Sequence, residues 1–175
     1  MDTFSHICAA FFPDCPVLAV EEIKVGHINR TYKITLNVAE QPRDFLLQSV
    51  NTYVFKEPQK VMENIAAVTE HIHSRLHFYP AADGRNFFAD DSGFWRICDY
   101  IPSVNYSSVE DLSVVKEAGR AFGQFQQQLS DFPADSLHET IPNFHNTVNR
   151  FANFEKSLKA DKMGRAESVK KEIDF

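Results

Sequence analysis

The chain has 175 residues and a formal net charge of -6, and 43% of its residues are hydrophobic. That acidic balance argues against nucleic acid as a partner, because binding to a phosphate backbone needs clustered Lys and Arg. No apolar run approaches the ~20 residues that a membrane span needs, and the N-terminus lacks a signal-peptide core. The three cysteines have no regular spacing, so no disulfide framework is expected. These features predict a cytoplasmic protein that binds neither membranes nor nucleic acids.

The first half of the chain has the pattern of a small antiparallel sheet. A short helix is predicted at 3–12, followed by a strand at 17–24. Residues 31–38 alternate apolar and polar side chains with a period of two, which indicates a half-buried strand. A turn is expected at 41–44, and a third strand at 45–50.

A helix is predicted to interrupt the strands at Pro58, because proline is favoured in the first turn of a helix. Its apolar face recurs at helical spacing, at Val61, Ile65, Val68, Ile72 and Leu76. Two aromatic-rich runs, at 86–89 and 94–101, then flank the turn residues 90–93 and predict a hairpin.

Only helices are expected after Pro102. The segment 107–110 resembles a capping box and precedes a helix whose apolar face is Val114, Ala118, Phe122, Phe125 and Leu129. A third helix is expected to carry Phe144, Val148, Phe151 and Leu158, and a fourth to span 164–175.

Strands followed by helices predict an α+β fold. We expect a lobe of five antiparallel strands and one helix at 1–102 and a helical part at 103–175. This order of elements resembles the small lobe of a protein-kinase-like fold, followed by the first helices of a large lobe.

Several local sequences strengthen that resemblance. The segment Gly26–Tyr32 resembles the nucleotide loop of the aminoglycoside phosphotransferase and choline kinase superfamily. Similarity to its N-acetylhexosamine 1-kinase branch extends over five further segments, which are 45–51, 54–56, 61–65, 118–125 and 141–147.

The resemblance implies an ATP-dependent kinase that acts with Mg²⁺ on the anomeric hydroxyl of an N-acetylhexosamine. Homoserine, choline and aminoglycosides remain alternative acceptors. A second class of function is a non-catalytic, pseudokinase-like module that binds a nucleotide or a protein partner. A third possibility is a purely structural fragment.

The expected nucleotide site combines a turn, a strand and an inter-lobe linker. Gly26 and His27 would lie over the phosphates, where glycine permits close approach of backbone N–H groups. Asn29 is expected either to cap this turn or to touch a phosphate. The backbone of Asp99, Tyr100 and Ile101 would hydrogen-bond adenine, although a simple strand end explains the same sequence.

Gln48 occupies the position where such kinases carry a lysine or arginine that pairs with the phosphates. Glutamine brings no charge, so the usual ion pair with a helix glutamate, for which Glu63 is the candidate, is in doubt. His145 is the candidate for contact with the sugar, although a histidine at a helix start is a competing interpretation.

Phosphoryl transfer in this fold also needs an aspartate that orients the acceptor and carboxylates that hold magnesium. The sequence contains no His-Gly-Asp, and no catalytic or metal-ligating residue is assigned. The chain ends within an expected helix, so we expect a truncated kinase that shows no turnover alone.

Overall fold

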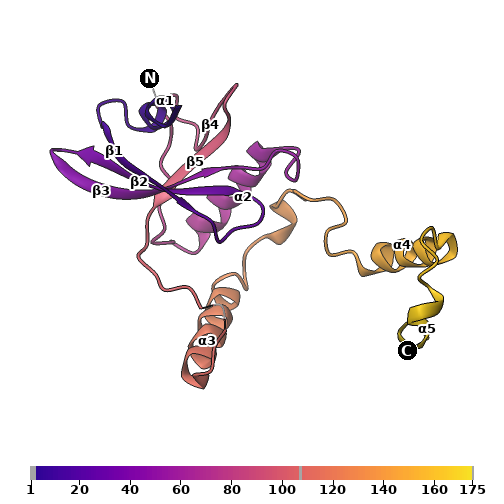
Figure 1. Cartoon of the computed structure of the whole chain (residues 1–175). Helices are drawn as coiled ribbons and strands as arrows, with labels where there is room; N and C mark the ends of the chain where they lie inside the picture. The colour runs from indigo at the N-terminus through magenta and orange to yellow at the C-terminus, as the bar shows by residue number, and fades with distance from the viewer. Residues whose placement is uncertain (1–2, 107, 175) are drawn as a thin grey trace. The chain divides into compact units, whose positions relative to one another are not determined.

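The computed structural model describes residues 3–106 and 108–174 and shows an α+β fold. Within these residues a five-stranded antiparallel sheet has the strand order β1-β2-β3-β5-β4 (Figure 1). The strands are β1 (Val17–Ile23), β2 (Arg30–Val38), β3 (Gln41–Ser49), β4 (Phe88–Asp90) and β5 (Gly93–Asp99). The predicted fold class is confirmed, including the helix inserted between the third and fourth strands.

The turn between β2 and β3 lies two residues earlier than predicted. Ala39 and Glu40 form it, with φ values of 49° and 65°, because two-residue hairpin turns need positive φ at their centre. Residues 41–44, which we expected to form the turn, belong to β3 instead. Pro42 is tolerated there because β5 pairs with β3 only from Phe45 onward.

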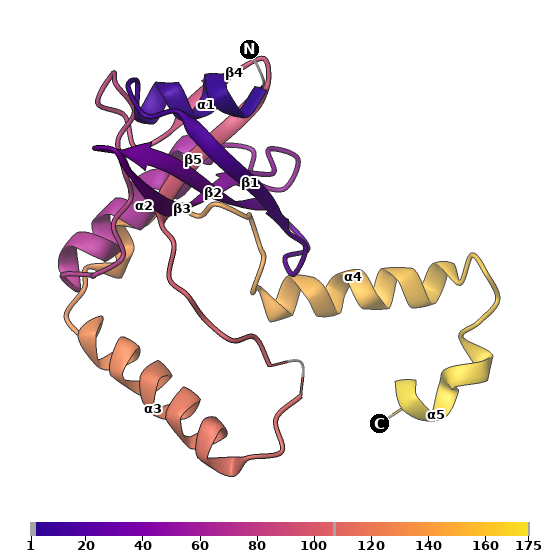
Figure 2. The same ribbon diagram turned by 60° about the vertical axis from the view of Figure 1, so that its left-hand side comes forward.

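The two faces of the sheet differ in chemistry. Alternate residues of a strand point to opposite faces, and directly paired residues of neighbouring strands share a face. One face carries the buried core and is covered by α1 (Thr3–Phe11), as Figures 1 and 2 show. Its side chains include Tyr32, Ile34, Leu36, Phe45, Leu47, Trp95 and Ile97.

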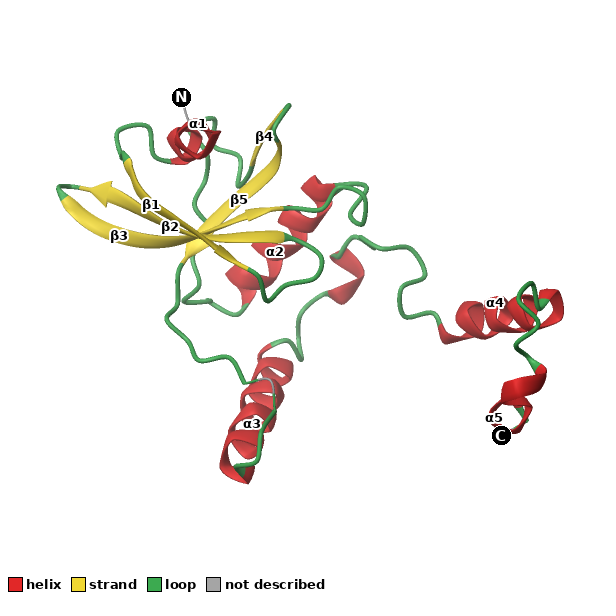
Figure 3. Ribbon diagram, viewed as in Figure 1, coloured by secondary structure: helices red, strands yellow, loops and turns green. Residues whose placement is uncertain are grey.

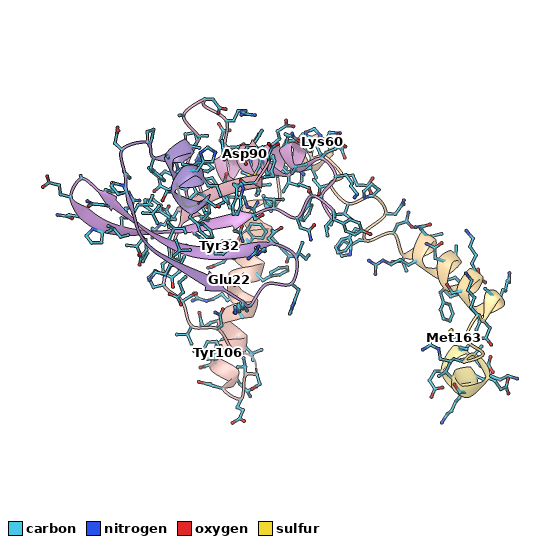
Figure 4. All side chains as sticks on the ribbon, turned by 45° about the horizontal axis from the view of Figure 1, so that its top comes forward. Glu22, Tyr32, Lys60, Asp90, Tyr106 and Met163 are labelled. Carbon is cyan, nitrogen blue, oxygen red and sulfur yellow. The ribbon has the colours of Figure 1, made fainter. Side chains whose placement is uncertain are left out.

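Aromatic packing and polar contacts hold α1 on this face. The ring of Phe4 meets Tyr32 edge to face with a centroid distance of 4.8 Å. At the end of β4, His6 Nε2 lies 2.9 Å from Asp90 Oδ2. Figure 4 labels Tyr32 within the sheet and Asp90 at its margin. The core of this lobe is therefore a helix packed on a sheet face.

Helix α2 (Pro58–His71) packs on the opposite face of the sheet. Met62 is fully buried in a cluster with Val50, Phe87 and Phe94. The helix ends five residues before the last position of its predicted apolar face, because His73 adopts a left-handed φ of 48°. Leu76 therefore lies outside the helix.

Helix α3 (Leu112–Gln128) begins at Asp111, whose Oδ1 accepts a 2.8 Å hydrogen bond from Ser113 N–H. The predicted capping box was wrong as the start of this helix, and its Ser107 lies outside the described residues. None of the residues of α3 is buried. The predicted helix exists, but its apolar face has no cover among the described residues.

The segment after α3 lies against α2. Asn64 donates to His138 O and accepts from His138 N–H, both at 2.9 Å. Asp131 Oδ1 lies 3.0 Å from His71 Nε2. Side chains of α2 thus hold a segment that is far away in the sequence.

The described chain divides into two compact units, one ending at Thr140 and the other beginning at Ile141. The second unit contains α4 (Thr147–Ala160), a single 3-10 turn (Glu167–Val169) and α5 (Lys170–Ile173), which Figure 3 shows in red. The predicted fourth helix is therefore two short pieces. No helix in the described ranges is long and apolar enough to cross a membrane.

Candidate functional site

The loop between β1 and β2 carries the predicted phosphate residues Gly26 and His27. Both are exposed. A Cβ added at Gly26 would lie 3.6 Å from the carbonyl oxygen of Asn29, which is an ordinary contact. The fold itself therefore does not need glycine at this position, and its lack of a side chain leaves the backbone accessible to a ligand.

Asn29 holds this loop to the end of β3. Its Oδ1 accepts a 3.0 Å hydrogen bond from Asn51 N–H, and Asn51 Nδ2 donates to Ile28 O at 3.2 Å. Asn51 Oδ1 also accepts from Tyr53 N–H at 2.9 Å. The hydrogen bond that Asn29 accepts ties the loop to residue 51 and is not a cap within the turn itself, and contact of Asn29 with a phosphate stays a prediction. The sequence analysis did not single out Asn51. Together, Asn29 and Asn51 form a clamp between the β1–β2 loop and the end of β3.

A pocket of about 310 Å³ opens at this end of the sheet. Its walls come from the β1–β2 loop, the end of β3 and the start of β5. The lining residues are Ile28, Arg30, Ser49, Val50, Asn51, Thr52, Tyr53, Gly93 and Phe94. The clamp between Asn29 and Asn51 thus shapes a hollow beside the expected phosphate loop.

Gln48 lies on the same sheet face as α2, between two polar neighbours. Its Nε2 donates to Thr31 Oγ1 at 3.1 Å, and its Oε1 accepts from Arg96 Nε at 2.9 Å. The three residues form one row across β2, β3 and β5, because Thr31 pairs with Gln48 and Gln48 pairs with Arg96. The amide thereby orients the guanidinium group.

Arg96 was not among the predicted site residues. Its pairing with Gln48 joins residues 48 positions apart, which no local pattern reports. The available signal was a cation in the middle of an otherwise apolar strand, with Phe94, Trp95, Ile97 and Cys98 around it. Burial lowers the pKa of Arg96, but an arginine remains protonated in proteins.

Glu63 lies on α2 next to Met62, and its side chain is directed elsewhere. Glu63 Oε2 pairs with His138 Nε2 at 2.6 Å. The residue of α2 that contacts Arg96 is Met62, with 3.8 Å between Met62 Sδ and a terminal nitrogen of the guanidinium group. The structure therefore brings Gln48 to Arg96 and Glu63 to His138.

A second polar row follows on the same face, nearer the linker. Lys33 Nζ lies 2.9 Å from Asp44 Oδ2 and 4.9 Å from the ring centroid of Tyr100. The hydrogen bond from Lys33, together with one from Thr35, lowers the pKa of Asp44. The predicted linker residue Tyr100 is thus placed on the polar side of the sheet, beside a neutralised cation.

The side chain of Asp99 is engaged within the fold. Its Oδ1 accepts from the Tyr79 hydroxyl at 2.7 Å and from Arg43 at 3.2 Å, and its Oδ2 accepts from His77 N–H at 3.0 Å. Burial raises the pKa of Asp99, but these hydrogen bonds and the Arg43 charge outweigh it, so the pKa is lowered overall.

The backbone of Asp99 differs from the linker that follows it. The N–H of Asp99 donates to His77 O at 3.1 Å, so it is already used. Ile101 is 61% exposed and follows the end of β5. The exposed part of the expected adenine contact therefore begins after Asp99.

His145 belongs to the second unit and is described within it alone. It is exposed, and its ring meets Phe144 edge to face with a centroid distance of 4.4 Å. The next residue, Asn146, caps α4 by accepting a 2.9 Å hydrogen bond from Asn149 N–H. His145 thus stands directly before a helix start.

Comparison with models of known protein families finds no match for this chain. Over residues 3–106 and 108–174, no group of three or more His, Cys, Asp or Glu side chains is arranged to hold a metal ion. The features that remain for chemistry are a clamped glycine loop, a polar sheet face that carries Arg96, and an exposed linker. Such an arrangement suits binding of an elongated anionic ligand.

Proposed function

We propose that this chain binds ATP on the polar face of its sheet and is the N-terminal part of a small-molecule kinase. The observation that carries this proposal is the placement of the glycine loop and the linker at opposite ends of the same three strands. Arg30, Ser49 and Trp95 pair across one end, and Phe45 pairs with Asp99 near the other.

The spacing of these two ends supports the proposal. Trp95 and Asp99 are four residues apart on β5, which corresponds to about 13 Å along a strand. Adenine at Ile101 would leave the phosphates near Gly26, beside the row of Gln48 and Arg96. The exposed loop backbone and the guanidinium group are both donors that suit phosphate oxygens.

The acceptor we propose is the anomeric hydroxyl of an N-acetylhexosamine, with Mg²⁺ supplied alongside ATP, in the cytoplasm. This part of the proposal rests on the resemblance of the chain to the N-acetylhexosamine 1-kinase branch. Kinases for homoserine, choline or aminoglycosides are the alternatives within the same superfamily.

A second candidate function is a non-catalytic nucleotide-binding module. It is favoured by Gln48, which brings no charge to the usual lysine position, and by the absence of His-Gly-Asp from the sequence. Both candidates share the nucleotide site and differ in whether an acceptor alcohol also binds.

Calorimetric titration with ATP tests the shared site. We expect saturable binding that Gly26→Leu weakens, because a bulky side chain blocks the backbone of the loop. Gly84→Leu is not a suitable control, since Gly84 has a φ of 82°. Gly123→Ala on α3 is suitable, because a Cβ there meets nothing within 4 Å. Absence of ATP binding, or equal binding by Gly26→Leu, would refute the proposed site.

Saturation-transfer NMR with N-acetylglucosamine, homoserine and choline tests the acceptor. If the proposal holds, NMR saturation passes from the protein to the acetylated sugar and to neither of the other two acceptors, in the presence of ATP. Because the chain contains no His-Gly-Asp, no ADP should form with any of the three acceptors. Binding of the acetylated sugar would support it as the acceptor, whereas ATP binding without binding of any acceptor would favour the non-catalytic module.

A further inference from the structure

Arg96 presents a charge that the rest of the fold does not balance. Across the two described stretches of the chain, no carboxylate forms an ion pair with it. Its described contacts are Gln48 Oε1, Met62 Sδ and the ring of Phe78, whose centroid lies 5.6 Å from the guanidinium carbon. A part-buried cation without a counter-charge is unfavourable, so this environment suits an anion from outside the chain.

The neighbouring cations are already neutralised. Lys33, in the next row of the same face, is paired with Asp44 at 2.9 Å. Arg30, at the end of the sheet, is paired with Glu22 at 3.4 Å. Cys98 is the neighbour of Arg96 on the same face of β5, and burial raises its pKa to about 11, so it stays neutral near pH 7. Among the described residues of this sheet face, Arg96 is therefore the cation without a paired carboxylate.

Gln48 holds Arg96 in a defined orientation. Its amide nitrogen is used by Thr31 and its carbonyl oxygen by Arg96 Nε, so both ends of this side chain serve the fold. An arginine has five N–H donors in a planar fork. The contacts with Gln48 and Met62 leave part of that fork unused. A guanidinium fork matches phosphate oxygens in geometry as well as in charge.

We propose that Arg96 binds the phosphate oxygens of the nucleotide, and that β5 thereby supplies the charge that β3 lacks at Gln48. This inference rests on the proposed nucleotide site. It assigns Gln48 the role of a positioning residue, and Arg96 that of the residue that touches the ligand. Tight binding of the triphosphate is then compatible with an uncharged residue in the usual lysine position.

Titrations with ATP, adenosine and inorganic tripolyphosphate test this assignment. For Arg96→Gln we expect ATP and tripolyphosphate to bind about ten- to a hundredfold more weakly, which is the range for loss of hydrogen bonds to a charged group. Adenosine affinity should stay unchanged. Lys33→Gln removes a charge of the same sign from the same face, but one that Asp44 already neutralises, so ATP affinity should change by less than about threefold.

A second variant keeps the test decisive if Arg96→Gln does not fold. Gln48→Glu preserves the side-chain size and places a carboxylate beside Arg96, which neutralises it in the folded chain. ATP and tripolyphosphate should then bind at least about tenfold more weakly, with adenosine unaffected. Unchanged ATP affinity in either variant overturns the role of Arg96 while the nucleotide site stands. If the unmodified chain binds no ATP, both the site and this inference are refuted.

Discussion

Replacing Asp99 by alanine should destabilise the first unit by about 2–3 kcal/mol. The carboxylate accepts hydrogen bonds from the Tyr79 hydroxyl and from His77 N–H at 2.7 and 3.0 Å. Hydrogen bonds to a charged group contribute about 1.5–3 kcal/mol each when they are buried. The lower end applies here because the site is only partly buried. The contact with Arg43 adds little, because that side chain is 51% exposed.

The assay is urea unfolding followed by fluorescence of Trp95, the single tryptophan, which lies in the core on the same strand as Asp99. Asp91→Ala is the matched control, because that carboxylate is exposed in the β4–β5 turn. We expect the control to remain within about 0.5 kcal/mol of the unmodified chain. A similarly small effect for Asp99→Ala would refute the proposed role of its hydrogen bonds.

The pH dependence gives an independent check of the same interaction. The pKa of Asp99 in the folded chain is lowered relative to an unfolded value of about 3.9. Its contribution to stability is therefore complete well above about pH 4 and is lost as the pH falls through the folded-state pKa. The stability difference between Asp99→Ala and the unmodified chain should shrink in that acidic range, and a difference that grows there would contradict the assignment.

Three further outcomes are expected. Asn51→Ala should cost about 1–3 kcal/mol and should speed amide exchange in 24–29, whereas unchanged exchange would show that the clamp does not hold this loop. Leu47→Ala, at a fully buried position, should cost about 2–5 kcal/mol in the same urea assay; a loss below about 1 kcal/mol would contradict the described core. At pH 8, Cys98 should be alkylated more slowly than the half-buried Cys15, because burial raises the Cys98 pKa to about 11, and mass spectrometry that finds equal rates would contradict this.

The sheet and its helices were largely predictable, because their signals are local. The alternation over 31–38 specifies a strand with one buried face, and β2 has that burial pattern. Pro58 and the apolar spacing after it mark the start of α2. The hairpin around 90–93 was predictable from the sequence because Asp, Ser and Gly are common in turns.

The errors have identifiable physical reasons. The β2–β3 turn was misplaced because Ala39 and Glu40 are unusual at positive φ, whereas Pro42 and its neighbours have turn-like composition. The start of α3 was misassigned because Asp111 and the segment 107–110 offer competing caps.

The candidate site was less predictable than the fold, because its contacts join residues that are distant in sequence. Gly26, Gln48 and Asp99 were singled out through a resemblance. The structure places Gln48 and Asp99 on the adjacent strands β3 and β5, and Gly26 on the loop between β1 and β2. The partners that give them their environment, Asn51 and Arg96, depend on strand register. The register between β3 and β5 depends on the tertiary structure, and no local sequence pattern specifies it.

The different chemistry of the two sheet faces bears on how such a protein can change during evolution. The aromatic and aliphatic side chains under α1 form the larger of the two buried clusters, so substitutions there are constrained by packing. Thr31, Lys33 and Gln48 on the other face are only partly buried, so exchanges among polar residues there disturb the core little. Selection for a new ligand can therefore act on one side of the sheet while the other keeps the chain folded.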